Sequence, residues 1–254
     1  VLPVDTARPR DPQLRVGPDG RLHLLYRETG GARATVRYLG LESDGTVVGQ
    51  PRTLSDDTDG TADAPCLARG AEGLFHALWA DDSGVRWAVL DGQDGSVVSG
   101  PDLLLPGVES PIIQEGPDGV LHLAWQQPAT GSAHSIYYAT LDPERGEVGT
   151  PEEIAEIALS GSLQLQEVAL VLSQDTGHVF WSEYQVRFDR YRFMHASFPL
   201  ESPQQRQVGR WQLKLGDGPL AIAPLDGAWA PPLVALSERM AGSGQEFDLQ
   251  ISLI

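Results

Sequence analysis

Residues 12–26, PQLRVGPDGRLHLLY, form a motif that recurs along this chain and decides its fold. Two further copies begin at Pro65 and Pro111, and in all three copies a His follows the Pro at the same distance, at positions 23, 76 and 122. Two weaker copies follow near residues 166 and 218. The copies therefore start about every 50 residues, which is the length of a four-stranded propeller blade.

Inside each copy the residues alternate with a period of two, which is typical of β-strands. Residues 22–26 are mostly apolar on both faces, as expected for a strand packed between neighbouring blades. Third strands are expected around residues 35–38, 85–87, 136–138, 191–193 and 247–249. Asp-Gly or Arg-Gly pairs at 44–45, 94–95 and 145–146 predict tight hairpins before a fourth, outer strand, because glycine readily adopts positive φ.

These patterns predict an all-β fold, a five-bladed β-propeller of four-stranded antiparallel blades, as one domain over residues 1–254. The blades are expected to start near residues 11, 64, 110, 166 and 218. The fifth copy ends after its third strand, so we expect residues 1–6 to supply its outer strand and close the ring. Residues 151–158 fit either one helical turn, because Pro and acids begin the segment, or an irregular outer strand.

The chain is acidic, with a formal net charge of -17. This charge disfavours nucleic-acid partners, whose phosphates are neutralised by Lys and Arg. It also disfavours an anionic membrane surface, and no apolar run is long enough to insert into a bilayer. Cations, basic proteins and neutral sugars stay open as ligands. Cys66 is the only cysteine, so no internal disulfide can form.

Carboxylates precede the innermost strand of each blade, and they are our candidate binding site: Asp11, Asp63, Glu109, Glu167 and Asp217. In a propeller such positions surround the mouth of the central channel. Acids gathered there repel one another unless a cation binds, and calcium is the ion that carboxylates and carbonyls prefer. The alternative is that these acids only begin strands and point to solvent.

The repeated histidines at positions 23, 76, 122 and 178 lie on inner strands of different blades. Zinc needs all its ligands at about 2 Å from one point, so separate blades cannot share one ion. We therefore expect each His to be structural and hydrogen-bonded between blades.

The repeat, with its Pro, Asp-Gly, His-x-x-Trp and Ile-Tyr-Tyr, resembles that of bacterial sialidase-like (BNR-type) propellers. Arg10-Asp11-Pro12 and Glu109-Ser-Pro111 also resemble motifs of five-bladed arabinanase- and xylosidase-type glycosidases. That second resemblance implies Asp11 as general base, Asp63 as the residue that tunes the acid, and Glu109 as general acid. The sialidase-like resemblance implies a location outside the cytoplasm.

The sequence thus favours a non-catalytic binding or protein-interaction propeller whose ligand, an unidentified protein or carbohydrate, binds at the channel mouth. The alternative is a glycoside hydrolase of the five-bladed type. The two hypotheses use the same carboxylates, so the surroundings of Asp11, Asp63 and Glu109 bear most directly on the choice.

Overall fold

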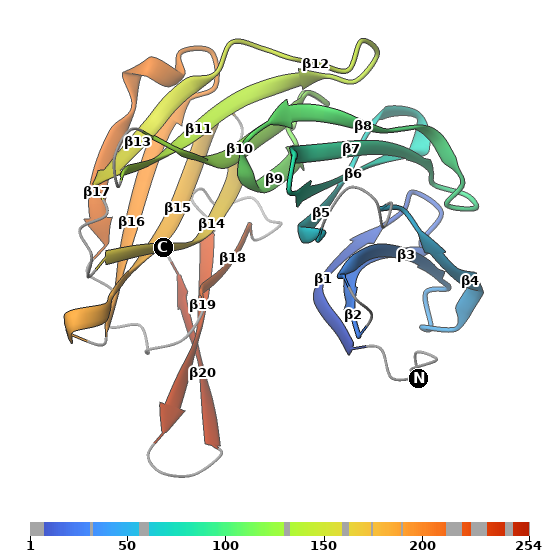
Figure 1. Ribbon diagram of the computed structural model, residues 1–254, viewed down its shortest axis with the longest axis horizontal. Helices are drawn as coiled ribbons and strands as arrows, with labels where there is room; N and C mark the ends of the chain where they lie inside the picture. The colour runs from blue at the N-terminus through green and yellow to red at the C-terminus, as the bar shows by residue number, and fades with distance from the viewer. Residues whose placement is uncertain are drawn as a thin grey trace. The chain divides into compact units, whose positions relative to one another are not determined.

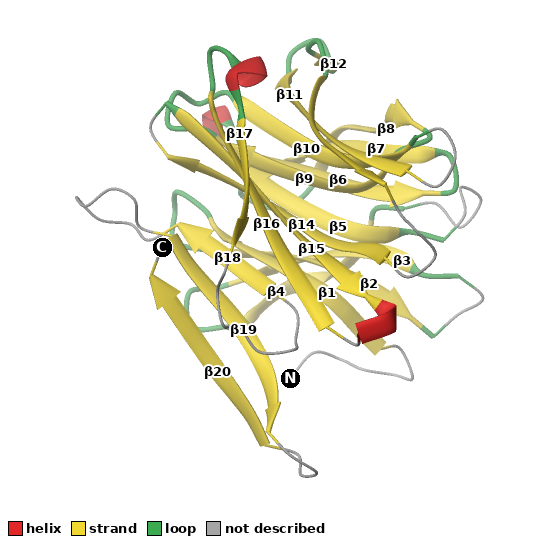
Figure 2. Ribbon diagram, turned by 90° about the vertical axis from the view of Figure 1, so that its left-hand side faces the viewer, coloured by secondary structure: helices red, strands yellow, loops and turns green. Residues whose placement is uncertain are grey.

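The computed structural model describes residues 8–30, 33–55, 61–129, 133–158, 163–173, 175–188, 190–211, 220–224, 233–241 and 246–253. The chain falls into two compact units, residues 1–127 with 139–150 and residues 128–138 with 151–254. Within the described ranges the secondary structure is β-strand, apart from three short 3-10 turns: η1 (Ala71–Gly73), η2 (Val186–Phe188) and η3 (Pro203–Gln205) (Figure 2). No described helix is long and apolar enough to span a membrane.

The first two blades of the first unit are four-stranded antiparallel sheets in sequence order (Figure 1). One consists of β1 (Arg8–Val16), β2 (Leu22–Thr29), β3 (Thr35–Leu41) and β4 (Val47–Thr53). The next consists of β5 (Asp63–Arg69), β6 (Leu74–Asp81), β7 (Gly84–Asp91) and β8 (Val97–Pro106). The predicted hairpin glycines adopt positive φ, with 85° at Gly45 and 68° at Gly95.

The third blade has an outer strand in two pieces. Its inner strands are β9 (Glu109–Glu115), β10 (Leu121–Pro128) and β11 (Ala133–Asp142), and both β12 (Glu147–Val148) and β13 (Glu152–Ala158) pair with β11. The ladder is interrupted around Gly149, whose amide donates to the Thr140 carbonyl. Residues 152–158 therefore form the irregular outer strand, and the helical alternative for this segment is wrong.

The second unit holds the last two sheets. The fourth blade contains β14 (Leu163–Ser173), β15 (Thr176–Gln185), β16 (Arg190–Pro199) and β17 (Gln207–Trp211). The fifth sheet has three described strands: β18 (Leu220–Pro224), β19 (Leu233–Ala241) and β20 (Glu246–Leu253). Residues 1–6, predicted to complete that blade, lie outside the described residues.

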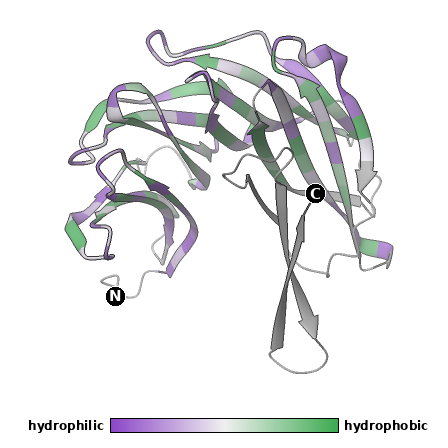
Figure 3. Cartoon of the chain, turned by 180° about the vertical axis from the view of Figure 1, so that it is seen from behind, coloured by the Kyte–Doolittle hydropathy of each residue, from purple (hydrophilic) through white to green (hydrophobic). Residues whose placement is uncertain are grey.

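The core forms where neighbouring blades face each other, because second strands such as β6 and β10 are buried on both faces. Figure 3 shows the hydrophobic residues spread along the strands. One cluster between the first two blades includes Leu25, Val36, Phe75 and Trp79, each at most 1% exposed. The aromatic residues after the repeated histidines are also buried, with Trp125 and Trp181 both at 2% exposure. Strands with two apolar faces thus pack between neighbours, as the sequence predicts.

The first three repeated histidines are buried and the fourth is partly buried, and the hydrogen bonds of His23 and His76 are made within a blade and not, as expected, between blades. His23 Nδ1 lies 2.7 Å from Tyr38 Oη, and the Trp87 indole donates to His76 Nδ1 at 3.2 Å; each partner belongs to the same blade. In both blades the partner lies on the third strand, β3 or β7. Contact between blades is made instead by stacking of His23 on Phe75, with ring centroids 4.0 Å apart. Burial lowers the pKa of His76 to about 4, which keeps its ring neutral.

A glycine lies beneath each of the first three histidines, six positions before it, at Gly17, Gly70 and Gly116. A Cβ at Gly17 would be 2.7 Å from His23 Nε2, and a Cβ at Gly116 would be 2.6 Å from His122 Nε2. Any larger residue would push the imidazole out of its place. The glycines are therefore required by close packing of the ring and are part of the repeat.

The substitution Gly116→Ala should lower the free energy of unfolding by about 1–3 kcal/mol, because the added methyl overpacks against His122. Urea denaturation would measure this loss. The control is Gly209→Ala, where nothing lies within 4 Å of an added Cβ, and where a change below about 0.5 kcal/mol is expected. Equal effects of the two substitutions would contradict the packing role.

Candidate functional site

The candidate site lies where the innermost strands β1, β5 and β9 begin. In each strand the residue just before the first proline of the repeat has a positive φ: 51° at Asp11, 46° at Ala64 and 49° at Ser110. Non-glycine residues rarely adopt this conformation, and a following proline restricts them further. The pairing register shifts at the same places, so each strand begins with a β-bulge that re-aims its first side chains.

The bulges show that the predicted carboxylates do not all occupy one position of the repeat. Asp11 corresponds to Ala64 and Ser110, the residues directly before proline, whereas Asp63 and Glu109 lie one residue earlier. Regular alternation of side chains is interrupted at a bulge, so the contacts of each carboxylate have to be taken from the structure.

Arg27, near the end of β2, joins two of the predicted carboxylates across the first two blades. Its Nε lies 2.8 Å from Asp11 Oδ2, and its Nη1 lies 2.9 Å from Asp63 Oδ1. Asp63 Oδ1 also accepts the amide of Ala64 at 2.8 Å. The guanidinium is 23% exposed, so it is partly shielded from water while its positive charge offsets the repulsion between the two carboxylates.

Arg27 is not among the predicted site residues, although the sequence carries a signal for it, a charged residue at a repeat position that is uncharged in the next two blades. The residue four positions after the repeated histidine is Arg27 in the first blade but Ala80 in the second and Gln126 in the third. A charged residue that breaks an otherwise regular repeat at a buried strand needs a partner. Here the partners are the carboxylates of Asp11 and Asp63.

A second grouping brings Asp63 and Glu109 together. Both line a pocket of about 210 Å³, whose remaining lining residues are Thr61, Ala64, Ala80, Asp81, Asp82 and Ser110. Asp81 has a structural role, because it accepts hydrogen bonds from Arg86 Nε at 2.7 Å and from the Ser83 amide at 2.7 Å. Asp63, Asp82 and Glu109 are thus the carboxylates that a ligand in this pocket would meet.

The calcium hypothesis gains no support from the described residues, among which no group of three or more His, Cys, Asp or Glu could hold a metal ion. Arg27 supplies a positive charge between Asp11 and Asp63. Besides Asp11, Asp63 and Glu109, two members were predicted: Glu167 lies within β14 but its side chain is not described, and Asp217 falls outside the described residues. Their part in the site stays a prediction.

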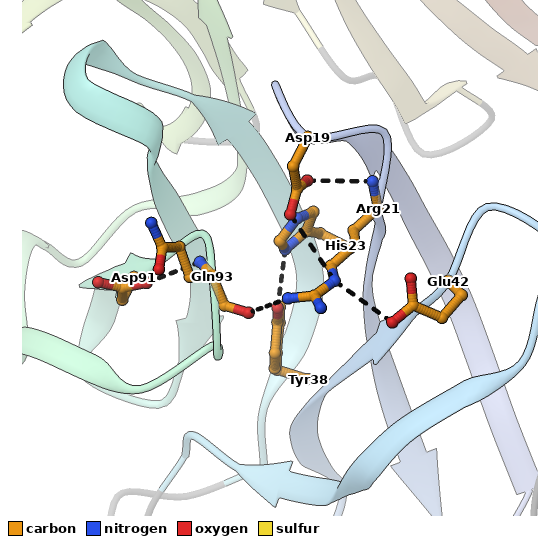
Figure 4. Close-up of polar contacts among 7 residues, drawn as sticks. All are labelled: Asp19, Arg21, His23, Tyr38, Glu42, Asp91 and Gln93. Atoms are coloured by element: carbon orange, nitrogen blue, oxygen red, sulfur yellow. Dashed lines mark hydrogen bonds and ion pairs between the residues drawn. The ribbon is translucent and has the colours of Figure 1, made fainter.

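A polar network at the opposite end of β2 fixes how the first two blades meet (Figure 4). Arg21 Nη1 donates to the carbonyl of Gln93 at 2.9 Å, which ties the turn before β2 to the turn between β7 and β8. Arg21 Nε also lies 3.4 Å from Glu42 Oε1, in the turn between β3 and β4. Arginines near both ends of β2 therefore connect the two blades, and Arg27 contacts both Asp11 and Asp63.

No protein-family model matches the sequence, and no curated protein matches it significantly. Solved structures do match. A protein of unknown function from Dyadobacter fermentans gives a TM-score of 0.70 at 12% identity, covering 94% of this chain and 77% of that one. An endo-arabinase from Bacteroides thetaiotaomicron gives 0.62 at 15% identity, covering 100% and 96%.

A Hadza microbial sialidase also matches, with a TM-score of 0.63 at 12% identity, covering 96% of this chain and 56% of the sialidase. The fold is that of a β-propeller. The resemblance to sialidase-like and arabinanase-type proteins therefore holds for the fold. At these identities it says nothing of the chemistry, which has to be argued from the residues of the site.

Replacing Arg27 by Met should lower the free energy of unfolding by about 1 kcal/mol, because Asp11 and Asp63 then face each other without a counter-charge. Raising the salt concentration should reduce this loss, because salt screens the repulsion. Thermal melts at low and high salt would measure both effects. The control is Arg69→Met, which removes a looser, more exposed contact of 3.5 Å to Glu115 and should change stability by less than about 0.5 kcal/mol. Equal losses in both variants would contradict the bridging role.

Proposed function

We propose that this chain is a glycoside hydrolase that binds a saccharide where β1, β5 and β9 begin. The observation that carries the proposal is the grouping of three carboxylates there: Arg27 bridges Asp11 and Asp63, and Asp63 shares a pocket with Glu109. Glycosidases cleave with a pair of carboxyl groups that flank the scissile bond. The likeness in fold to an endo-arabinase supports this reading.

In this proposal each carboxylate has its own task. Glu109 protonates the oxygen of the leaving sugar, and Asp11 takes a proton from the attacking water. Asp63 and Arg27 are positioning residues: the guanidinium contacts both aspartates, so it fixes where Asp11 lies relative to the pocket. The bulges at the strand starts add to this, because backbone strain of this kind concentrates at functional sites.

A second candidate is a binding module without catalysis, which was the favoured hypothesis from the sequence. The lining of the Asp63–Glu109 pocket favours it, since none of these eight residues is aromatic and a sugar ring would find no stacking surface there. The pocket is also smaller than the roughly 300–1,000 Å³ of typical ligand sites. The site would then hold its ligand, a protein segment or a carbohydrate, without cleaving it.

The proposal extends to the architecture and to the location. We propose five blades, with residues 1–6 pairing as the fourth strand beside β20 in the three-stranded sheet β18-β19-β20. The repeat sequence then belongs with the BNR-type propellers that it resembles. A hydrolase of polymeric saccharides acts where its substrate is found, so we also propose that the chain works outside the cytoplasm.

Deleting residues 1–6 should lower the melting temperature markedly and promote aggregation, because an apolar sheet edge is then exposed. Differential scanning fluorimetry and light scattering would report both changes. Adding Gly-Ser before Val1 is the control and should leave melting unchanged. A deleted chain that melts like the intact one would remove N-terminal closure, without bearing on the activity.

The intact chain should hydrolyse members of a panel of arabino- and xylo-oligosaccharides. Glu109→Gln should then reduce the rate by about 10²-fold or more, because the leaving oxygen is no longer protonated. The loss should be much smaller on a nitrophenyl glycoside, whose leaving group needs little protonation. The matched control is Asp82→Asn, a carboxylate of the same pocket that takes no part in the proposed proton transfers, and it should slow hydrolysis far less than Glu109→Gln does.

Three other outcomes decide between the candidates. Binding of a panel member without hydrolysis would favour the non-catalytic module. Equal losses for Glu109→Gln and Asp82→Asn would contradict the role of Glu109 as acid. Neither binding nor hydrolysis across the panel would remove both proposals.

A further inference from the structure

A separate groove lies at the seam between the second and third blades, within the first unit. It measures about 290 Å³ and lies between the outer strand β8 and the turn that joins β11 to β12. Its lining consists of Trp87, Ser99, Asp102, Leu103, Leu104, Pro143, Glu144, Arg145 and Gly146. It shares no residue with the Asp63–Glu109 pocket.

Trp87 forms the rigid base of this groove. Its side chain is only 5% exposed and its indole donates to His76, so the ring cannot turn away. The turn from the third blade rests directly on it: a Cβ at Gly146 would be 2.8 Å from Trp87 Cζ3, and the φ of 65° at Gly146 also requires glycine. The two walls of the groove are therefore held in a fixed relation.

Both walls of the groove, β8 and the turn between β11 and β12, carry a carboxylate. Asp102 on β8 is the cross-strand partner of Trp87, so its carboxylate lies beside the indole, and Glu144 projects from the facing turn. Neither carboxylate has a hydrogen bond or ion pair with another side chain in the described part of the chain. Arg145 is the one basic residue of the lining, and it forms an ion pair with Asp142, whose Oδ2 lies 3.8 Å from Arg145 Nη1.

We propose that this groove binds an arginine side chain of a basic partner protein. A guanidinium is planar and makes paired hydrogen bonds to carboxylates, so it matches a narrow groove whose base is an indole and whose walls carry two acids. The net charge of -17 attracts such a partner over a distance. The groove, at about 290 Å³, has room for one long side chain.

The partner inserts a side chain and does not add a strand to β8. Pro101, in the middle of β8, has no amide hydrogen to donate, and the pairing of β8 with β7 shifts register three times. An irregular edge of this kind resists pairing with another strand. The inference does not depend on the proposed hydrolase activity, because it uses none of the carboxylates of that site.

The test is a titration of the isotopically labelled full chain with acetyl-Gly-Arg-Gly-amide, followed by the assigned NMR signal of the Trp87 indole N–H. The signal should shift and saturate, and the apparent affinity should fall as salt is added. The same peptide with citrulline, a neutral isostere of arginine, should bind roughly tenfold more weakly or not at all, because the charge-assisted bonds are lost.

The double substitution Asp102→Asn, Glu144→Gln should abolish the shift, and it should leave the fold intact because both residues are on the surface. The matched control is Glu147→Gln, an exposed acid just outside the groove, which should bind the peptide like the unchanged chain. Absence of a saturable shift, equal binding of the citrulline peptide, or unchanged binding by the double variant would each overturn the proposal. A saturable shift with xylo-oligosaccharides that the double variant abolishes would assign the groove to saccharides and overturn it as well.

Discussion

A buried, neutral imidazole packed over a glycine organises the inner hairpin of each of the first three blades. The ring lies so close to Gly17 or Gly116 that no Cβ fits beneath it, and its Nδ1 is met by a side chain of the third strand in the first two blades. One small contact thereby fixes the turn, the inner two strands and the third strand together. In the first blade the same ring stacks on Phe75, which brings the second blade into place.

The candidate site depends on that arrangement, because it lies at the opposite ends of the same strands. Once the histidine, Arg21 and the apolar core fix the first blade against the second, Arg27 reaches both Asp11 and Asp63. The strained starts of the inner strands turn these carboxylates away from the ladder. Stability thus comes from one end of each hairpin, and the groups able to act on a ligand come from the other.

The fold was largely predictable from the sequence, because a constant spacing from Pro12 to His23 reflects two strands and a turn of fixed length. The partners of the histidines were not predictable, since Tyr38 and Trp87 lie at different offsets and only the paired strands bring them near. Residues 152–158 carry helix-like signals, yet pairing with β11 outweighs local preference. Arg27 was not predicted because the repeat pattern shows what the blades share, whereas Arg27 lies where the first blade departs from the others. The Trp87 groove was not predictable either, because its lining comes from two blades that are separate in the sequence.

A ligand bound where β1, β5 and β9 begin should protect the backbone of these three strand starts from solvent. Hydrogen–deuterium exchange of the Glu109→Gln variant, with and without the arabino- or xylo-oligosaccharide that it binds best, tests this most directly. We predict slower exchange confined to amides in residues 8–12, 61–64 and 108–112, whose strands carry Asp11, Asp63 and Glu109. Unchanged exchange in all three segments, or protection only elsewhere in the chain, would contradict the account.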